Sequence, residues 1–228
     1  MAEFFDFMRT SFLHVSPILL AGVIALAIII ERARALCIVY PLKNAPEFFD
    51  RLSEFVTAGR SAEALTLCDR YHQKPSARVI KQGLLRAHQP EELIEHGLHI
   101  AVSEASQMVQ RRTSFLATIA NVATLLGLLG TIAGLIHSFQ AVGHADPQQK
   151  SALLAAGISQ AMNATMLGLG VAIPCMIAFS FLINRTNRLI SEIDQSAVRT
   201  MDMLQQRYYL AETETLRKQS RPAERGAA

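Results

Sequence analysis

Residues 115–139 read FLATIANVATLLGLLGTIAGLIHSF, a run of twenty-five residues without a charged side chain. Two further runs share this property: residues 11–30 contain twenty uncharged residues, and residues 151–184 contain thirty-four. A helix needs about 20 mostly apolar residues to cross the hydrocarbon core of a bilayer. Because uncharged runs of this length are rare in soluble helical proteins, the three runs predict three transmembrane helices.

The overall composition agrees with this prediction. Of the 228 residues, 50% are hydrophobic and 18% are charged, against about 25% charged residues in ordinary globular domains. So much apolar surface excludes an intrinsically disordered chain. The three cysteines, Cys37, Cys68 and Cys175, are odd in number and far apart. They exclude a disulfide-stabilised mini-protein, and their spacing offers neither a zinc motif nor a redox motif.

The distribution of Lys and Arg predicts the orientation in the membrane. Arg9 precedes the first run, and Lys150 is the one basic residue between the second and third runs. Twelve Lys and Arg residues lie between the first two runs, and eight follow the third. The positive-inside rule therefore places the large loop and the C-terminus in the cytoplasm and the N-terminus outside. The start MAEFFDFMRT is not a basic signal-peptide region, so we expect a retained anchor.

The expected fold is an all-α integral membrane protein with three transmembrane helices, two of which extend far into the cytoplasm. No helix-breaking residue interrupts the pattern from Pro90 to about Ser138, which predicts one helix about 70 Å long. The expected segments are an external N-terminus (1–10), a first transmembrane helix (11–31), a cytoplasmic helical loop (32–114), a second transmembrane helix (115–139), an external hairpin (140–150), a third transmembrane helix (151–184), and a cytoplasmic helix with a tail (185–228).

Small and polar residues distinguish the second and third runs. Gly127, Gly130 and Gly134 lie three and four residues apart, and such a face lets helix backbones approach closely in lipid. Gln160 and Asn163 are three residues apart and share a helix face. An amide pair at membrane depth is unfavourable unless it lines water or a partner. Hydrogen bonding between helices is the alternative explanation.

Two motifs carry a resemblance to a known family. Residues 125–139, LLGLLGTIAGLIHSF, and residues 157–165, GISQAMNAT, followed by GLGVAIP at 168–174, resemble the signature of the ExbB/TolQ/MotA proton-channel family. The resemblance implies a pentamer in the inner membrane of Gram-negative bacteria, so that the external segments are periplasmic. It also implies a single-span partner of the ExbD/TolR kind inside the pore, whose Asp carries protons. The work would pass to a TonB-like or TolA-like energy transducer or to a motility apparatus.

The resemblance also implies roles for individual residues. Thr131 and Thr165 match pore-facing threonines of the second and third spans. Gln160 stands where ExbB and TolQ proteins commonly carry a glutamate, and an amide cannot titrate. We expect Thr131, Gln160 and Thr165 to form a polar ring that hydrogen-bonds the partner's Asp or its water, and Asn163 is a further candidate for this proton pathway. Gln160 and Thr165 are five residues apart, about 140° around a helix, so they can flank a pore but cannot both point straight into it. The residues expected to serve helix packing are Gly127, Gly130, Gly134, Gly168, Gly170 and Pro174.

Other functions find less support in the sequence. His137 lies near the outer end of the second span and could admit protons, although a structural role is the more common explanation for such a residue. No nucleotide-binding or nucleophile-elbow motif occurs, so we expect no enzyme, cofactor, metal or nucleic-acid partner. Three functions remain open: a subunit that energises TonB-type or Tol-type transport across the envelope, a gliding-motility motor subunit, and a non-conducting membrane scaffold. The missing carboxylate at position 160 is the best argument for the scaffold.

Overall fold

The computed structural model describes residues 12–42, 44–143 and 145–225. Within these ranges all regular elements are helices and no strand is present. Three of the helical stretches are long and apolar enough to cross a membrane, which confirms the predicted all-α membrane fold. The predicted N-terminal segment 1–10 lies outside the described residues. The chain divides into two compact units, with boundaries after Arg34, Arg111 and Asn184.

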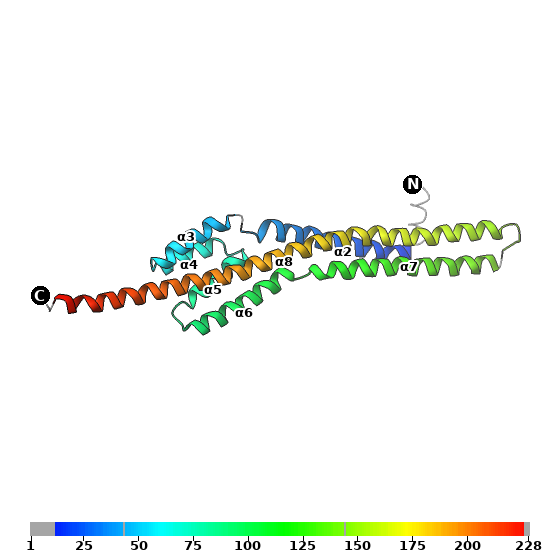
Figure 1. Cartoon of the computed structure of the whole chain (residues 1–228). Helices are drawn as coiled ribbons and strands as arrows, with labels where there is room; N and C mark the ends of the chain where they lie inside the picture. Colours follow the sequence, from blue (N-terminus) through cyan, green and yellow to red (C-terminus); the bar gives the residue numbers. More distant parts are fainter. Residues whose placement is uncertain (1–11, 43, 144, 226–228) are drawn as a thin grey trace. The chain divides into compact units, whose positions relative to one another are not determined.

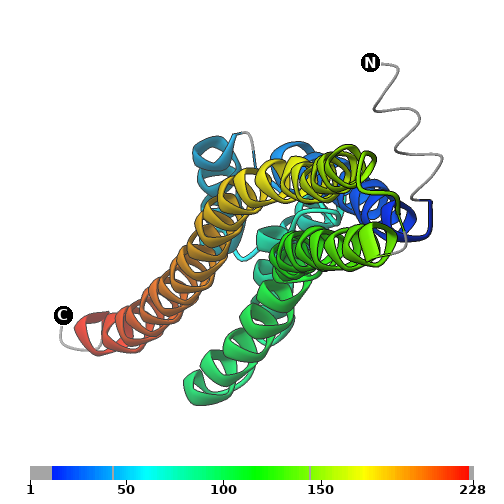
Figure 2. The ribbon, with the colours of Figure 1, turned by 90° about the vertical axis from the view of Figure 1, so that its right-hand side faces the viewer.

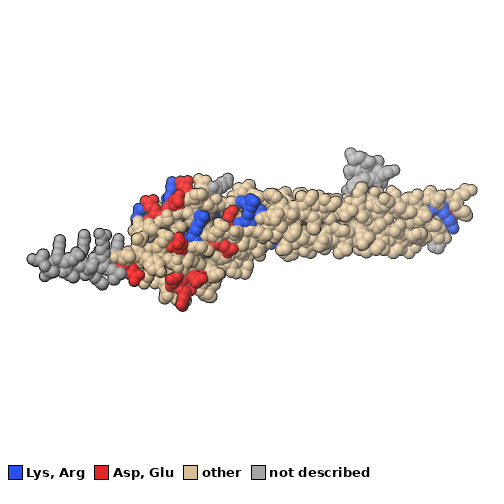
Figure 3. Space-filling view, in the orientation of Figure 1, with Lys and Arg blue, Asp and Glu red and all other residues tan. Residues whose placement is uncertain are grey.

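The first unit contains the three uncharged runs. Its helices are α2 (Phe12–Arg34), α7 (Thr113–Gly143) and the part of α8 (Lys150–Arg225) that ends at Asn184. α7 and α8 run antiparallel and side by side in both ribbon views (Figures 1 and 2), and α2 packs against α7. Almost no charged side chain appears on the visible face of this unit (Figure 3). Such a surface suits a lipid environment, because a charged residue in the hydrocarbon core is energetically costly.

The second unit is built from short amphipathic helices. It contains one π-helical turn (Ala35–Val39), α3 (Ala45–Thr57), α4 (Ser61–Arg70), α5 (Pro75–Leu85), α6 (Glu91–Gln110) and α8 from Arg185 onward. Each helix turns an apolar stripe inward, as period-3.6 patterning requires. The shared core includes Phe48, Leu52, Val56, Ile80, Leu98 and Ile193, all at most 4% exposed.

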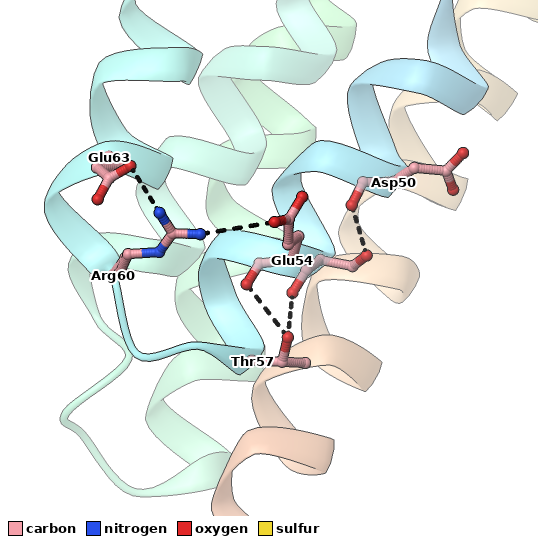
Figure 4. Close-up of polar contacts among 6 residues, drawn as sticks. Asp50, Glu54, Thr57, Arg60 and Glu63 are labelled. Atoms are coloured by element: carbon pink, nitrogen blue, oxygen red, sulfur yellow. Dashed lines mark hydrogen bonds and ion pairs between the residues drawn. The ribbon is translucent and has the colours of Figure 1, made fainter.

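The turn between α3 and α4 shows how this unit holds its short helices together. Gly59 adopts a φ of 73°, a left-handed conformation that glycine adopts without steric strain. The guanidinium of Arg60 then lies 3.6 Å from the Glu54 carboxylate and 3.3 Å from the Glu63 carboxylate (Figure 4). It also covers the Phe55 ring at 4.9 Å. These groups are exposed, so the ion pairs contribute little stability each, but they bridge the two helices across the turn.

Two cationic side chains bind carbonyls of the π-helical turn. Lys74 Nζ donates a hydrogen bond to the Val39 carbonyl at 2.5 Å, and Arg185 Nε donates to the Leu36 carbonyl at 3.3 Å. The last carbonyls of a helix lack partners within the helix and attract positive charge. Both hydrogen bonds therefore stabilise the π-helical turn in which the helix that begins with α2 ends.

The prediction of one helix from Pro90 to about Ser138 is wrong. α6 ends at Gln110 and α7 begins at Thr113, with Arg112 between them at a φ of 65°. A non-glycine residue rarely adopts this conformation. Arg112 Nη1 lies 2.9 Å from both carboxylate oxygens of Glu31 at the end of α2. Residues 108–115 contain neither Gly nor Pro, so the local sequence pattern around Arg112 shows no sign of the break.

α8 remains a single helix of 76 residues. The sequence predicts this continuity, because no Gly or Pro lies between Cys175 and Arg221. Pro174 is exposed and stands within the helix without ending it. The helix therefore belongs to both units without a break in its secondary structure.

Candidate functional site

Two hydroxyl groups meet between the apolar helices of the first unit. Thr131 on α7 and Thr165 on α8 are half-buried, and their Oγ1 atoms contact each other. Thr131 Oγ1 also lies 3.0 Å from the Gly127 carbonyl oxygen, and Thr165 Oγ1 lies 3.3 Å from the same oxygen. A hydroxyl carries one proton and two lone pairs. The two hydroxyl protons are thus shared among three oxygen atoms, those of the two hydroxyls and of the Gly127 carbonyl. The cluster keeps lone pairs that can accept a hydrogen bond from water or from a protonated carboxyl group.

Glycines allow the two helices to approach closely enough for this contact. A Cβ placed on Gly127 would lie 3.2 Å from the Cα of Gly168, and one on Gly130 would lie 2.7 Å from the Cβ of Ala164. A Cβ on Gly168 would lie 2.7 Å from the Ala123 carbonyl oxygen, and one on Gly134 would lie 3.1 Å from the Cβ of Ala161. Real Cβ atoms do not approach within 3.0 Å. The small residues therefore set the distance between α7 and α8, as expected for helices that associate in lipid.

The remaining residues predicted for packing lie elsewhere on α8. A Cβ on Gly170 would meet no described atom within 4 Å, and Pro174 is exposed. By contrast, Gly157 is not among the residues predicted for packing, although a Cβ there would collide with the buried side chain of Ser138. The signal was present, since Gly157 begins a stripe of small residues that continues through Ala161.

Gln160 and Asn163 do not share the surroundings of the two hydroxyls. Gln160 is exposed in the single chain, whereas Asn163 is half-buried. Gln160 and Thr165 are five residues apart and so point about 140° away from each other around the helix. Within one chain, the structure brings the two threonines together and places Gln160 on a different face of α8. The predicted ring of three residues stays a prediction.

The other candidate groups form no reactive cluster in the described part of the chain. His137 is exposed on α7. No three His, Cys, Asp or Glu side chains gather as a metal ion would require within residues 12–42, 44–143 and 145–225. Cys68 is 1% exposed in the second unit, and burial raises the pKa of its thiol from 9.0 to about 12. A thiol so protonated is a poor nucleophile.

Comparison with known proteins identifies relatives along most of the chain. The family model of the MotA/TolQ/ExbB proton channel family matches residues 71–195, more than half of the chain. This range includes both threonines and both amides of the candidate site.

Three curated relatives illustrate the similarity. A Methanothermobacter thermautotrophicus protein, named as a biopolymer transport protein ExbB homolog, is 34% identical over 67% of this chain and 52% of its own length. The Tol-Pal system protein TolQ of Haemophilus influenzae is 31% identical over 74% of this chain and 77% of its own. The biopolymer transport protein ExbB of Neisseria gonorrhoeae is 34% identical over 44% of this chain and 47% of its own. The chain thus spans about half the length of two of these relatives.

Proposed function

Because the chain belongs to the MotA/TolQ/ExbB proton channel family, we propose that it is the multi-span subunit of an inner-membrane, proton-conducting complex. The complex would use the proton motive force to energise TonB-type or Tol-type processes across the envelope. Relatives named ExbB and TolQ support both processes. A gliding-motility motor of the same family is a further form of this function. The family consists of channel or transport subunits, so we assign no enzymatic activity.

The observation that carries the proposal is the contact between Thr131 and Thr165. Polar groups inside a membrane are unfavourable unless they hydrogen-bond or line water, and they commonly mark ion pathways. Here two hydroxyls and one carbonyl lie together within the uncharged stretches of α7 and α8. Such a cluster can pass hydrogen bonds along a file of water or hold a protonated side chain without binding a proton itself.

The proposed partners follow from family membership. A single-span ExbD-like or TolR-like protein would supply a membrane Asp as the proton carrier, and a TonB-like or TolA-like protein would receive the work. Several copies of the chain, five by analogy, would surround the partner, with the N-terminus in the periplasm and the C-terminus in the cytoplasm. In this assembly the Gln160 amide would orient the carboxyl or its water, because an amide donates and accepts hydrogen bonds without titrating.

Proton uptake into proteoliposomes tests the proposal. The chain is reconstituted with its single-span partner, and flux is measured with the partner's Asp intact or changed to Asn. We expect flux to disappear with Asn. We expect Thr131→Val and Thr165→Val each to lower flux about tenfold, the equivalent of about 1.4 kcal/mol. Thr124→Val is the matched control, because the Thr124 hydroxyl bonds the Ala120 carbonyl within its own helix.

Position 160 separates the conducting complex from a scaffold. Gln160→Leu should abolish flux without disturbing assembly, whereas Gln160→Glu should retain it. A complex that assembles fully yet conducts no protons with the native sequence would contradict the proposal and favour the scaffold. Full flux in Gln160→Leu would remove Gln160 from the pathway.

A further inference from the structure

An apolar groove runs between two helices of the second unit. α6 and α8 lie antiparallel there, and the groove between them has a volume of about 570 Å³. Its apolar lining includes Leu98 and Val102 on α6 and Val198 and Met201 on α8. A smaller hollow of about 280 Å³ shares Met201 with it and continues toward the start of α6. The two hollows form one surface, which we call the α6–α8 groove.

The charges along the α6–α8 groove have one sign. Glu95, Asp194 and Asp202 line the larger hollow, and Glu91 lines the smaller one. None of the described lining residues is Lys or Arg. Figure 3 shows acidic side chains gathered over the start of α6. A ligand with positive charges on either side of an apolar face would therefore complement the groove.

Large apolar side chains remain uncovered along the same surface. Val198 is 70% exposed, and Tyr208 and Tyr209 are 69% and 62% exposed. Clustered exposed apolar residues rimmed by polar groups mark interaction sites. The exposure is notable because the neighbouring Leu98 and Leu204 are buried, at 4% and 7%. The two helices therefore pack against each other along part of their surface and leave the rest for another element.

We infer that the α6–α8 groove binds a basic amphipathic helix of a partner protein. A cleft between two antiparallel helices accepts the side-chain ridge of a third helix, and the carboxylates along the rim would pair with its Lys and Arg residues. From Asp194 to Tyr209 the groove spans about 22 Å of α8, which corresponds to roughly fifteen residues of a bound helix. This inference is independent of the proposed proton pathway, since the hydroxyl pair lies in the first unit.

The binding test uses a designed peptide as the probe. The peptide has sixteen residues, Leu at positions i, i+3, i+4 and i+7 of each repeat, Lys on the flanks, and a fluorescent label. Its fluorescence anisotropy is measured against the full-length protein in detergent. We expect saturable binding that weakens as salt is added, because the charges are exposed. A peptide of the same pattern with Glu in place of Lys should bind at least tenfold more weakly.

Isosteric substitutions assign the binding to the groove. Asp194→Asn combined with Asp202→Asn should weaken Lys-peptide binding at least tenfold. Glu192→Gln should leave it unchanged, because Glu192 is exposed on the same helix and does not line the groove. Circular dichroism and gel filtration verify that the variants fold. Equal binding of the Lys and Glu peptides, or full binding by the double variant, would overturn the inference.

A second copy of the chain is the competing occupant. In a Cys37→Ser background, which removes the exposed native thiol, Val198→Cys reports whether the groove is open in the assembled protein. We expect a maleimide reagent to modify this thiol and the Lys peptide to slow the reaction at least fivefold. A thiol that resists the reagent without peptide, or that cross-links to another copy, would show that homomeric packing fills the groove.

Discussion

The two units solve the packing of helices in opposite ways. In the first unit, contacts between α7 and α8 are made by glycine and alanine, so that the backbones themselves touch. In the second unit, Phe, Leu, Ile and Val supply the largest buried side chains, alongside several buried alanines. In water, burial of large apolar side chains drives association. In lipid that drive between helices is absent, and close van der Waals contact takes its place. The same chain thus shows two interiors suited to two solvents.

Polar groups follow the same division. Thr131, Ser138 and Thr165 of the first unit donate to backbone carbonyls of α7, at 2.8–3.3 Å. Exposed ion pairs lie in the second unit, as in the bridge from Arg60 to Glu54 and Glu63, and at the end of α2, where Glu31 pairs with Arg112. A hydroxyl bonded to the backbone can enter a bilayer, whereas an ion pair is stable only near water.

Ile80→Ala should cause the largest loss, because Ile80 is fully buried in the second unit. Removing a large buried side chain costs about 2–5 kcal/mol. Chemical denaturation in detergent, followed by circular dichroism, measures the change in the free energy of unfolding. Leu85→Ala is the matched control on the same helix, because Leu85 is 46% exposed. A loss below about 1 kcal/mol in Ile80→Ala would show that a side-chain core does not stabilise this unit.

Gly168→Ala tests the backbone contact of the first unit. The added methyl would lie 2.7 Å from the Ala123 carbonyl oxygen and 2.9 Å from the Cα of Gly127. Overpacking of this kind costs about 1–3 kcal/mol, and we expect a lower melting temperature in detergent. Gly170→Ala, two residues along the same helix, adds its methyl where no described atom lies within 4 Å. Equal melting temperatures for the two variants would contradict the assigned contact.

The Cys68 thiol gives the second unit a pH dependence. Burial raises its pKa from 9.0 to about 12, so the folded state holds the proton more tightly than the unfolded state. The contribution of Cys68 to the free energy of unfolding is therefore fully present below pH 9. It declines as the pH rises toward 12, with a limiting slope of about 1.4 kcal/mol per pH unit. Denaturation at several pH values measures the slope. Cys68→Ala should flatten it, and an unchanged slope would assign the effect to other groups.

Arg60→Gln should have the smallest effect. The variant removes both ion pairs and the contact with Phe55, yet all these groups face water. Exposed ion pairs contribute about 0.2–1 kcal/mol each, and the loss should diminish at high salt. Chemical denaturation with and without 0.5 M NaCl measures this loss, because that salt concentration shortens the electrostatic screening length to about 4 Å. A loss as large as that in Ile80→Ala would mean that the turn, and not the core, holds α3 and α4 together.

Much of the fold was predictable from local patterns. The uncharged runs located the three apolar helices, and the absence of Gly and Pro after Cys175 predicted the continuity of α8. The spacing of Gly127, Gly130 and Gly134 indicated a smooth face. The break at Arg112 was missed because residues 108–115 contain neither Gly nor Pro. Apolar periodicity reports which face of a helix is buried, but it does not report a single residue that adopts a left-handed conformation between two helices.

The candidate site divides in the same manner. The resemblance singled out Thr131 and Thr165. Their direct contact, and the bonds of both hydroxyls to the Gly127 carbonyl, are visible only in the structure. The sequence placed Gln160 in the same ring but also predicted that it points about 140° away from Thr165 around the helix. The spacing of five residues determines the angle between the two side chains around α8. The spacing does not determine which of the two, Gln160 or Thr165, faces α7, because that depends on tertiary packing.

By itself the sequence determined that this chain is helical, that three of its helices suit a membrane, and that it belongs to a family of channel subunits. These properties depend on composition, period and motif, which are local. The tertiary structure decided where the helix path breaks, which hydroxyls meet, and which part of α6 and α8 remains uncovered. These features depend on contacts between residues far apart in the chain, and the free energy of such contacts is set by the geometry of both partners.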